Sequence, residues 1–445
     1  MNRIEEALSR ARDTKELEFG EGVMGKAPAM FRKLFPGKKA VIVADSNTFE
    51  AAGRTVQGHL KESGLEVEEP FIFTDPELYA EWSYLEKVEA YLRERDVIAV
   101  AVGSGVINDL CKLASAHLGR RYIIVGTAAS MDGYTAYGAS ITFEGNKQTF
   151  DCPAPLGMIM DPAVAAKAPK GMSASGYADL LAKVPAGADW IIADAVGSEA
   201  VEPFAFSLVQ DGLRDALSDP VAVDGGDVVA TGKLADGLIM SGFAMQAISS
   251  SRPASGTDHQ FSHFWDMEGL CYGGKHVSHG FKVAIGTLVS TACLEFLLGK
   301  NLEALDVEKC VSAWPLWEEM ESRIREIFAG KPGHLARALT ESNGKYTDAE
   351  GIRAQLEAVK GNWSTLREKI RGQIMLFDQV HDCLRKVGAP YEPEMIGVSR
   401  EKLRSTFRCI PYMRNRFTGI DLLQRAGLMD EVEEYLFGKG GHWEI

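Results

Sequence analysis

Four of the nine histidines lie between residues 259 and 279, and their types and spacing are suited to chemistry. His259 and His263 stand four residues apart in TDHQFSHFW, so in a helix they face the same side, one turn apart. His279 opens the apolar segment HGFKVAIG, where a further helix is expected to begin. Imidazoles from adjacent helices can converge on one divalent cation. Spacing alone leaves two alternatives open, a metal site or ordinary surface and capping histidines.

A carboxylate inside an apolar helical segment could complete such a site. Asp179 lies in SGYADLLAKVPAGADW, and acidic side chains are rarely buried without a partner. One aspartate with two histidines leaves a coordination position for substrate, which is typical of catalytic metal sites and suits Zn²⁺, Ni²⁺ or Fe²⁺. The alternative is that Asp179 caps its helix or pairs with Lys183 four residues later.

A glycine-containing segment is a second candidate site, in this case for binding a cofactor. AVGSGVINDL, residues 101–110, follows an apolar strand and precedes a helix, the setting in which backbone amides bind a pyrophosphate. Its spacing is not GxGxxG, so a structural turn is the alternative. Asp45 ends an earlier strand, where a carboxylate could bind an adenosine ribose and repel a 2′-phosphate. This favours NAD(H) over NADP, unless Asp45 only begins the turn DSNT.

The elements that position these residues follow from hydrophobic periodicity. Up to about residue 165, apolar runs alternate with amphipathic stretches, which predicts βαβ units around a parallel sheet. The clearest strands are at 40–44, 97–102 and 122–125, and their carboxyl ends are expected to share one crevice. After about residue 170 helical periodicity predominates. The sequence therefore predicts a Rossmann-like α/β nucleotide-binding domain at residues 1–168 and an all-helical metal- and substrate-binding domain at residues 169–445.

Charge and composition limit the classes of function. The formal net charge of −14 disfavours nucleic acid or an anionic membrane as a partner. The N-terminus lacks the apolar core of a secretory signal, and seven cysteines without a CxxC motif fit reduced cytoplasmic thiols. The longest apolar stretch, about 283–299, carries Glu295 and is expected to be a buried helix rather than an integral membrane segment.

Six motifs follow one another in the order VADSNT, VGSGVINDL, GTAASMDGYTA, GYADLLAKVPAGADW, SRPASGTDHQFSH and HGFKVAIGTL. Together they resemble the sn-glycerol-1-phosphate dehydrogenases, in the superfamily of iron-containing alcohol dehydrogenases, glycerol dehydrogenase and dehydroquinate synthase. A late segment, IPYMRNRFTGIDLL at 410–423, resembles the bacterial branch. The resemblance covers about residues 20–430. It implies a two-domain, dehydroquinate synthase-like metalloenzyme that interconverts dihydroxyacetone phosphate and sn-glycerol 1-phosphate with a nicotinamide cofactor. We also expect a homo-oligomer.

The resemblance also implies roles for matching positions. Asp179, His259 and His279 match metal ligands, and Asp132, Asp179 and His263 match substrate-contacting residues. His263 and Asp132 are the expected catalytic residues, with His263 in a proton relay beside a Lewis-acid metal. From the residues alone, Asp132 would instead be a turn residue. Together with Asp45, the expected cofactor-binding positions are Gly103, Ser104, Gly105, Val106, Ile107, Asp109, Thr127, Ala128, Ala129 and Ser130.

Three positions depart from the family pattern. Phe281 replaces the usual acid after the HG pair, Asp258 replaces a glutamate before the first ligand histidine, and Ala136 stands where a serine is expected. None of them removes a metal ligand. Phe281 lacks the carboxylate and Ala136 lacks the hydroxyl that the family pattern has at these positions.

A small phosphorylated triose or polyol is the expected partner, and its phosphate needs cations or N–H donors. Arg252, Lys275 and Lys282 are near in sequence, and the sequence does not choose among them. Two other enzymes remain open on the same scaffold, a sugar-phosphate cyclase of the dehydroquinate synthase type and a dehydrogenase of an unphosphorylated polyol such as glycerol. A non-catalytic metal-binding protein is the third alternative.

Overall fold

The computed structural model describes residues 3–445, and the chain folds into two compact units. Unit 1 consists of Met1–Leu180, Ser207–Ser251 and Lys386–Gly388, and unit 2 of Leu181–Phe206, Arg252–Arg385 and Ala389–Ile445. The predicted boundary at 168/169 lies after the last strand of the parallel sheet, and as a domain division it stays a prediction.

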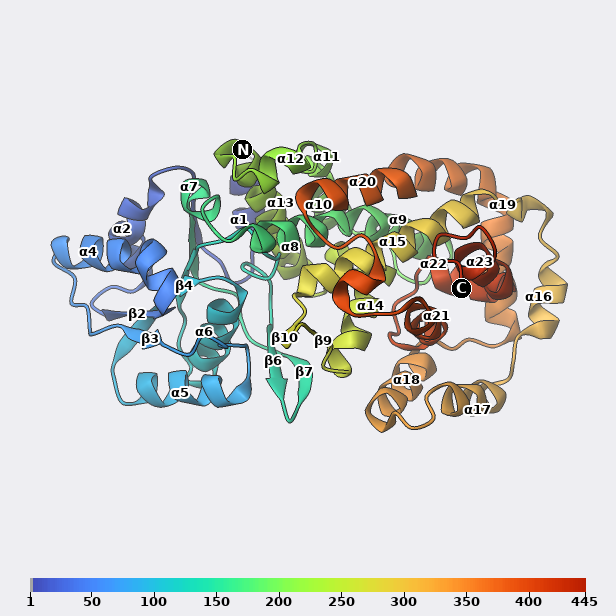
Figure 1. Ribbon diagram of the computed structural model, residues 1–445, viewed down its shortest axis with the longest axis horizontal. Helices are drawn as coiled ribbons and strands as arrows, with labels where there is room; N and C mark the ends of the chain where they lie inside the picture. The colour runs from blue at the N-terminus through green and yellow to red at the C-terminus, as the bar shows by residue number, and fades with distance from the viewer. Residues whose placement is uncertain (1–2) are drawn as a thin grey trace. The chain divides into compact units, whose positions relative to one another are not determined.

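A six-stranded parallel sheet forms the centre of unit 1 (Figure 1). Its order is β1-β8-β5-β4-β2-β3. The strands are β1 Glu16–Phe19, β2 Lys39–Asp45, β3 Phe71–Phe73, β4 Val97–Gly103, β5 Ile123–Gly126 and β8 Gly157–Met160. The three strands predicted most clearly are β2, β4 and β5. Their apolar runs are continuous because parallel strands are covered on both faces, and every residue of β4 and β5 is buried.

The strand order reverses direction between β2 and β4. From β2 the chain passes outward to β3 and then returns to the other side of β2 with β4. Ligands of open α/β sheets bind outside the carboxyl ends of the strands at such a switch point. Asp45 ends β2 and Gly103 ends β4, so the predicted crevice coincides with this edge.

Helices cover the sheet, and its core includes Phe31, Val56 and Leu60 packed with residues of β2, β4 and β5. The helices of unit 1 are α1 Arg3–Arg10, α2 Ala27–Leu34, α3 Ser46–Thr48, α4 Arg54–Glu62, α5 Trp82–Arg93, α6 Gly105–His117, α7 Pro162–Ala165, α11 Leu213–Ala216, α12 Pro220–Asp224 and α13 Val228–Ile248, with a 3₁₀ turn η1 at Val23–Lys26 and a π-helical turn η2 at Phe49–Gly53. An antiparallel hairpin pairs β6 Ala139–Phe143 with β7 Asn146–Phe150.

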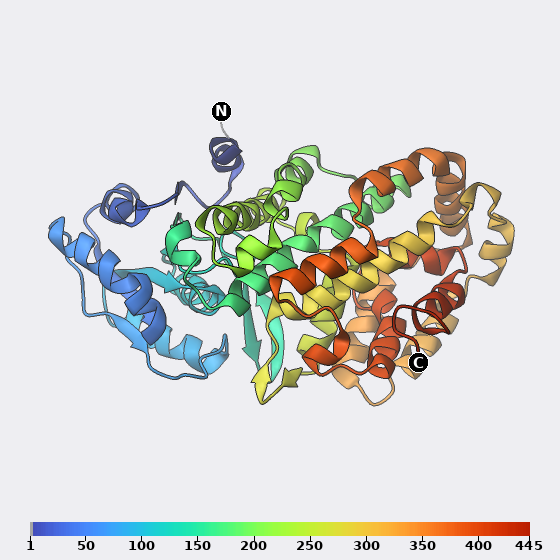
Figure 2. The ribbon, with the colours of Figure 1, turned by 45° about the horizontal axis from the view of Figure 1, so that its top comes forward.

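Unit 2 is mostly helical. Its helices are α9 Lys183–Ala195, α14 Thr257–Met267, α15 His279–Leu298, α16 Val307–Ala313, α17 Trp317–Ile327, α18 Pro332–Lys345, α19 Ala349–Gln373, α21 Arg400–Cys409, α22 Gly419–Arg425 and α23 Met429–Phe437, with 3₁₀ turns η3 Arg252–Ala254, η4 Leu302–Ala304, η5 Pro393–Ile396 and η6 Ile410–Tyr412. Three further helices have residues in both units, namely α8 Lys170–Leu181, α10 Pro203–Gln210 and α20 Phe377–Val387. Helix α15, yellow in Figure 2, lies beside the green α9.

The prediction that everything after residue 168 is helical is wrong at one hairpin. β9 Cys271–Tyr272 and β10 Lys275–His276 pair antiparallel between α14 and α15. Gly273 and Gly274 both have positive φ, 59° and 78°, as a tight two-residue hairpin turn requires. Strands of two residues are too short to show a period in the sequence.

Two helices, α13 and α15, are long and apolar enough to span a membrane by length and composition alone. Within their most apolar windows, 61% of α13 and 83% of α15 is buried inside the protein, as in core helices. The predicted buried helix at about 283–299 is therefore confirmed as α15.

Candidate active site

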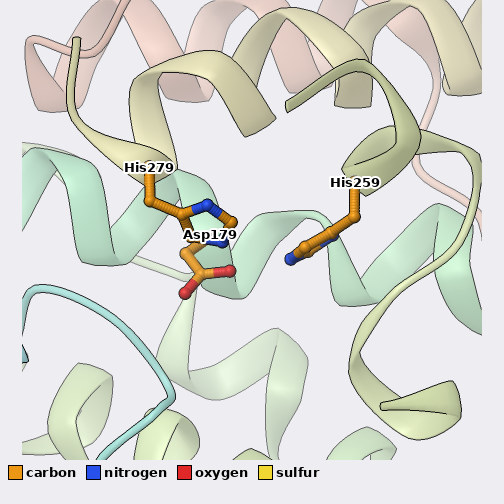
Figure 3. A group of neighbouring side chains, drawn as sticks. All are labelled: Asp179, His259 and His279. Atoms are coloured by element: carbon orange, nitrogen blue, oxygen red, sulfur yellow. The ribbon is translucent and has the colours of Figure 1, made fainter. Parts of the chain in front are cut away.

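Asp179, His259 and His279 lie together in the structure (Figure 3). Asp179 comes from α8, His259 from the first turn of α14, and His279 is the first residue of α15. One ligand atom from each lies within 4.8 Å of the others, and the side chains point toward one another. The structure thus brings the three predicted ligands together. One carboxylate oxygen and two imidazole nitrogens fit a divalent transition metal, which the sequence predicts here.

Both predicted ligand histidines have a polar neighbour at Nδ1. Asp258, which is fully buried, makes a close contact with Nδ1 of His259. The Ser262 hydroxyl lies 3.2 Å from Nδ1 of His279. Contacts of this kind orient metal-binding imidazoles, so a metal here would be bound through Nε2 of each ring. Asp258 thus keeps a carboxylate beside the ligand histidine although the family pattern has a glutamate.

Helix α8 holds Asp179 against the loop that follows β5. A Cβ atom on Gly176 would lie 2.0 Å from the carbonyl oxygen of Ala129, so glycine is required for this close approach. One turn later, Oδ2 of Asp179 accepts a hydrogen bond from the backbone N–H of Asp132 at 3.1 Å. The predicted metal ligand and the predicted substrate residue are therefore directly linked.

Asp132 is more than a turn residue. It is 9% exposed, and its Oδ2 accepts a hydrogen bond from the Ser241 hydroxyl of α13 at 2.9 Å. A Cβ on Gly242 would lie 2.2 Å from Oγ1 of Thr135, so α13 also packs closely against this loop. Asp132 is thus held from both its backbone and its side chain.

Lys112 organises the same loop, although its place in the sequence did not single it out as a functional residue. This buried lysine of α6 donates to the carbonyl oxygens of Gly133, Ala136 and Gly138 at 2.9, 2.9 and 3.0 Å. Its Nζ lies 3.9 Å from Asp109. Burial lowers the pKa of Lys112 and raises that of Asp109, and the charge of each partner opposes the other's shift. A lysine in the apolar helix NDLCKLASAH was the available signal.

The predicted cofactor loop lies at the carboxyl ends of β4 and β5. Gly103 pairs with Gly126, and the N–H of Thr127 donates to the carbonyl oxygen of Gly103 at 3.1 Å. Helix α6 begins at Gly105, and within the described chain the Ser104 side chain makes no capping bond to its first turn. An uncapped N-terminus at this edge suits an anionic group of a nucleotide.

Close packing explains why the loop is rich in small residues. A Cβ on Gly103 would lie 2.6 Å from Cβ of Ile107, and one on Gly105 would lie 3.3 Å from Met131. Val106 is half-buried. Thr127, Ala128 and Ala129 are buried and Ser130 is half-buried.

Asp45 begins the turn DSNT, which was the alternative to a role in binding the cofactor. Its Oδ1 accepts hydrogen bonds from the backbone N–H groups of Asn47 and Thr48 at 2.8 and 2.9 Å, which caps α3. The turn beginning at DSNT is therefore present. The contact with an adenosine ribose stays a prediction.

His263 lies one turn beyond His259 on α14, with their ring centroids 6.4 Å apart. Desolvation holds the pKa of His263 well below its usual range, and the positive charges of Arg414 and Arg337 act in the same direction. The imidazole is therefore neutral near pH 7 and carries one N–H donor and one acceptor.

Known proteins are similar to this chain over most of its length. A family model for iron-containing alcohol dehydrogenases matches residues 18–169. A glycerol-1-phosphate dehydrogenase of Geobacillus thermodenitrificans is 29% identical over 88% of this chain and 88% of its own. One of Pyrococcus furiosus is 31% identical over 62% of this chain and 77% of its own. The chain belongs to the glycerol-1-phosphate dehydrogenase family.

Membership of the glycerol-1-phosphate dehydrogenase family confirms the resemblance found in the sequence and makes the protein an oxidoreductase. The family relatives carry NAD(P)⁺ in their names. The crystal structure of glycerol dehydrogenase from Schizosaccharomyces pombe aligns with a TM-score of 0.58 at 17% identity, over 95% of this chain and 89% of that one. This confirms the predicted fold class, with the second part mostly rather than wholly helical.

In this member of the glycerol-1-phosphate dehydrogenase family, two of the three cations suggested by the sequence for a phosphate already have structural partners. Arg252 is fully buried and donates to the carbonyl oxygens of Asp189 and Phe417 at 2.9 and 3.0 Å. Lys282 is paired with Asp266 in the interior. Lys275 is exposed on the β9–β10 hairpin. The first two hold the fold of unit 2 together.

Proposed function

We propose that this protein interconverts dihydroxyacetone phosphate and sn-glycerol 1-phosphate with a nicotinamide cofactor. The observation that carries the proposal is the convergence of Asp179, His259 and His279 in a chain of the glycerol-1-phosphate dehydrogenase family. Three ligands leave a coordination position for a substrate oxygen. A sugar-phosphate cyclase and a dehydrogenase of unphosphorylated polyols are not favoured by the relatives.

Asp179, His259 and His279 would hold one divalent metal, Zn²⁺, Ni²⁺ or Fe²⁺. Bound there, the metal supplies Lewis-acid polarisation of the C2 carbonyl. Asp258 and Ser262 orient the two imidazoles through Nδ1.

The edge formed by β2, β4 and β5 would bind the cofactor, which supplies the hydride. The N-terminus of α6 receives the pyrophosphate, with the glycines at 103 and 105 allowing close approach of the backbone. Asp45 favours NAD(H) over NADP, because its carboxylate would repel a 2′-phosphate while Oδ1 continues to cap α3.

Asp132 and His263 would act on the substrate. Asp132 is held by its bonds to Asp179 and Ser241 and binds a substrate hydroxyl. His263 is a neutral imidazole and passes a proton between the C2 oxygen and solvent, a contribution typically worth about 10² to 10⁴ in rate. We also propose that the protein is cytoplasmic and homo-oligomeric. Its two domains would divide at 168/169.

The test follows cofactor absorbance in protein that has been stripped of metal with a chelator. NADH oxidation by dihydroxyacetone phosphate should be absent and should return on addition of Zn²⁺, Ni²⁺ or Fe²⁺. NADPH in place of NADH tests the assignment of Asp45. Dihydroxyacetone and glycerol in place of their phosphates test the polyol alternative, and net NADH consumption excludes a cyclase, which returns its cofactor. Absence of metal-dependent NADH oxidation would overturn the proposal.

A further inference from the structure

Asp189 of helix α9 is a buried carboxylate that has no part in the function described so far. It lies in the motif GYADLLAKVPAGADW, and its side chain is fully buried. A buried charge is costly unless polar groups compensate it. The groups that compensate Asp189 therefore indicate which parts of the chain it holds in place.

Two helix N-termini meet at this one carboxylate. Oδ2 of Asp189 accepts a hydrogen bond from the N–H of Thr257, the first residue of α14, at 2.7 Å. Oδ1 accepts one from the N–H of Gly419, the first residue of α22, also at 2.7 Å. The first N–H groups of a helix have no partner inside the helix and carry partial positive charge, so an anion suits them. Asp189 thus caps both helices.

Helix α14 depends on this cap because its own sequence supplies none. Its N-cap residue is Gly256, which has no side chain that could accept a hydrogen bond. A Cβ on Gly256 would lie 2.3 Å from Oδ2 of Asp189, so a local capping side chain would collide with the carboxylate. Helix α22 differs, because Asp421 accepts from the N–H of its N-cap residue Thr418 at 2.8 Å. The carboxylate from α9 therefore takes the place of a local cap at α14.

Two arginines hold the same segments together. Arg252, just before α14, donates to the carbonyl oxygens of Asp189 and Phe417 at 2.9 and 3.0 Å. Arg416, just before α22, donates to the carbonyl oxygen of Ser255 at 2.7 Å. These bonds join α9, the start of α14 and the segment IPYMRNRFTGIDLL within unit 2. The N-terminus of α14 therefore has a fixed position in this unit.

His259 is the third residue of α14 and lies in the turn that Asp189 caps. Its ring centroid lies 5.2 Å from that of His279, the first residue of α15. The two helices are closely packed at this turn, since a Cβ on Gly286 of α15 would lie 2.1 Å from the carbonyl oxygen of Asp258. A small displacement of the first turn of α14 would therefore change the separation of the two imidazoles.

We propose that Asp189 is a positioning residue, which caps α14 and thereby holds His259 at the distance from His279 that a metal ion requires. The metal-binding role of the two histidines rests on the proposed function. Desolvation raises the pKa of Asp189 to about 6, and the hydrogen bonds from Thr257 and Gly419 oppose the rise. The carboxylate is therefore mostly ionised at neutral pH, as its place between two helix N-termini requires.

The test compares Asp189→Asn with Asp161→Asn as a matched control. Asp161 is also buried, and its two carboxylate oxygens accept from the N–H groups of Gly22 and Ala163 at 2.8 and 2.9 Å. An amide has one acceptor oxygen and one donor nitrogen, so each variant loses a capping bond and should have a lowered melting temperature. Asp161 belongs to unit 1 and caps α7, so its replacement should leave the metal ligands as they are.

Co²⁺ is the probe, added to protein that has been stripped of metal with a chelator. Its affinity, followed by visible absorption of the bound ion, should fall about tenfold in Asp189→Asn, as for loss of a residue that orients a metal ligand. The absorption bands should also shift, because they report the geometry of the ligands. Asp161→Asn should bind Co²⁺ like the wild type, with the same bands.

A second variant, Thr257→Pro, changes the donor instead of the acceptor. It removes the N–H that Oδ2 of Asp189 accepts, and proline is otherwise favoured at the first position of a helix. Co²⁺ affinity should fall as in Asp189→Asn, and combining the two changes should cost little more than either alone, because both remove the same bond. If Asp189→Asn does not fold, Thr257→Pro against Asp161→Asn decides the question.

Wild-type Co²⁺ affinity and bands in Asp189→Asn or in Thr257→Pro would overturn the proposal. An equal loss of affinity in Asp161→Asn would overturn it too, because any weakening of the fold would then have the same effect, and so would absence of Co²⁺ binding by the wild type. The proposed function fails separately. If Co²⁺ binding follows the expected pattern while dihydroxyacetone phosphate oxidises no NADH, the role of Asp189 stands and the proposed function alone is overturned.

Discussion

Two candidate binding regions differ in the groups that they offer to a ligand. One is the strand-end region, residues 103–107 and 127–130, and the other is the cluster of Asp179, His259 and His279. The strand-end region offers backbone groups, and Gly103 is required there because a Cβ would meet Ile107. The cluster offers side-chain donors, and its geometry depends on neighbours such as Asp258. Backbone sites are therefore specified by topology and small residues, and side-chain sites by residue type plus orienting contacts.

Replacing Asp179 should have the largest effect of the four changes. The effect should fall on metal binding by the cluster and spare the strand-end region. Asp179→Ala removes the carboxylate donor, so bound metal measured by elemental analysis should fall to background. kcat/KM should fall by more than about 100-fold. Loss of a residue that only orients a metal ligand typically costs up to about 100-fold, and loss of the ligand itself should cost more. NADH binding, followed by fluorescence, should persist because the strand-end region is intact. The exposed Asp96→Ala is the control. Retained metal would show that the ligand assignment is wrong.

Removing the charge of Asp258 tests whether orienting contacts matter to the cluster. Asp258→Asn keeps the size of the side chain but weakens its contact with Nδ1 of His259. Metal affinity, measured by competition with a chelator, should fall about 10- to 100-fold, and saturating metal should restore activity. Asp96→Asn should leave the affinity as it is. An unchanged affinity in Asp258→Asn would contradict the orienting role.

Adding one methyl group at Gly103 should affect the strand-end region and spare the cluster. In Gly103→Ala the new Cβ collides with Ile107, and the loop must shift. The KM for NADH should rise about tenfold while metal content stays the same, since overpacking costs typically 1 to 3 kcal/mol. Gly58→Ala is the matched control, because no described atom lies within 4 Å of its Cβ position. A lowered metal content in Gly103→Ala would show that the two regions are not independent.

Gly176 tests the contact through which α8 meets the strand-end loop. In Gly176→Ala the Cβ would lie 2.0 Å from the carbonyl oxygen of Ala129, so the free energy of unfolding should fall by about 1 to 3 kcal/mol. Urea unfolding gives the value. Gly361→Ala, in α19 with open space around it, should instead gain about 0.5 to 1 kcal/mol. Equal stability of Gly176→Ala and the wild type would mean that α8 adjusts without cost.

Much of the site could be predicted because its signals are local. The apolar runs of β2, β4 and β5 and the i, i+4 pair His259 and His263 can be read from neighbouring residues. Lys112 could not, because a lysine in an apolar helix gains its meaning from carbonyl oxygens 21 to 26 residues away. The hairpin β9–β10 was missed because its strands are two residues long.

By itself the sequence determined the residue types available for metal, cofactor and substrate, the family to which the chain belongs, and the strand ends that carry the predicted cofactor loop. The tertiary structure decided which groups meet and which are already committed. It placed Arg252 and Lys282 in structural bonds and joined Arg416 to the carbonyl oxygen of Ser255, just before α14. The reason is that the free energy of a charged group depends on burial and on neighbours distant in the chain, and neither is encoded in local spacing.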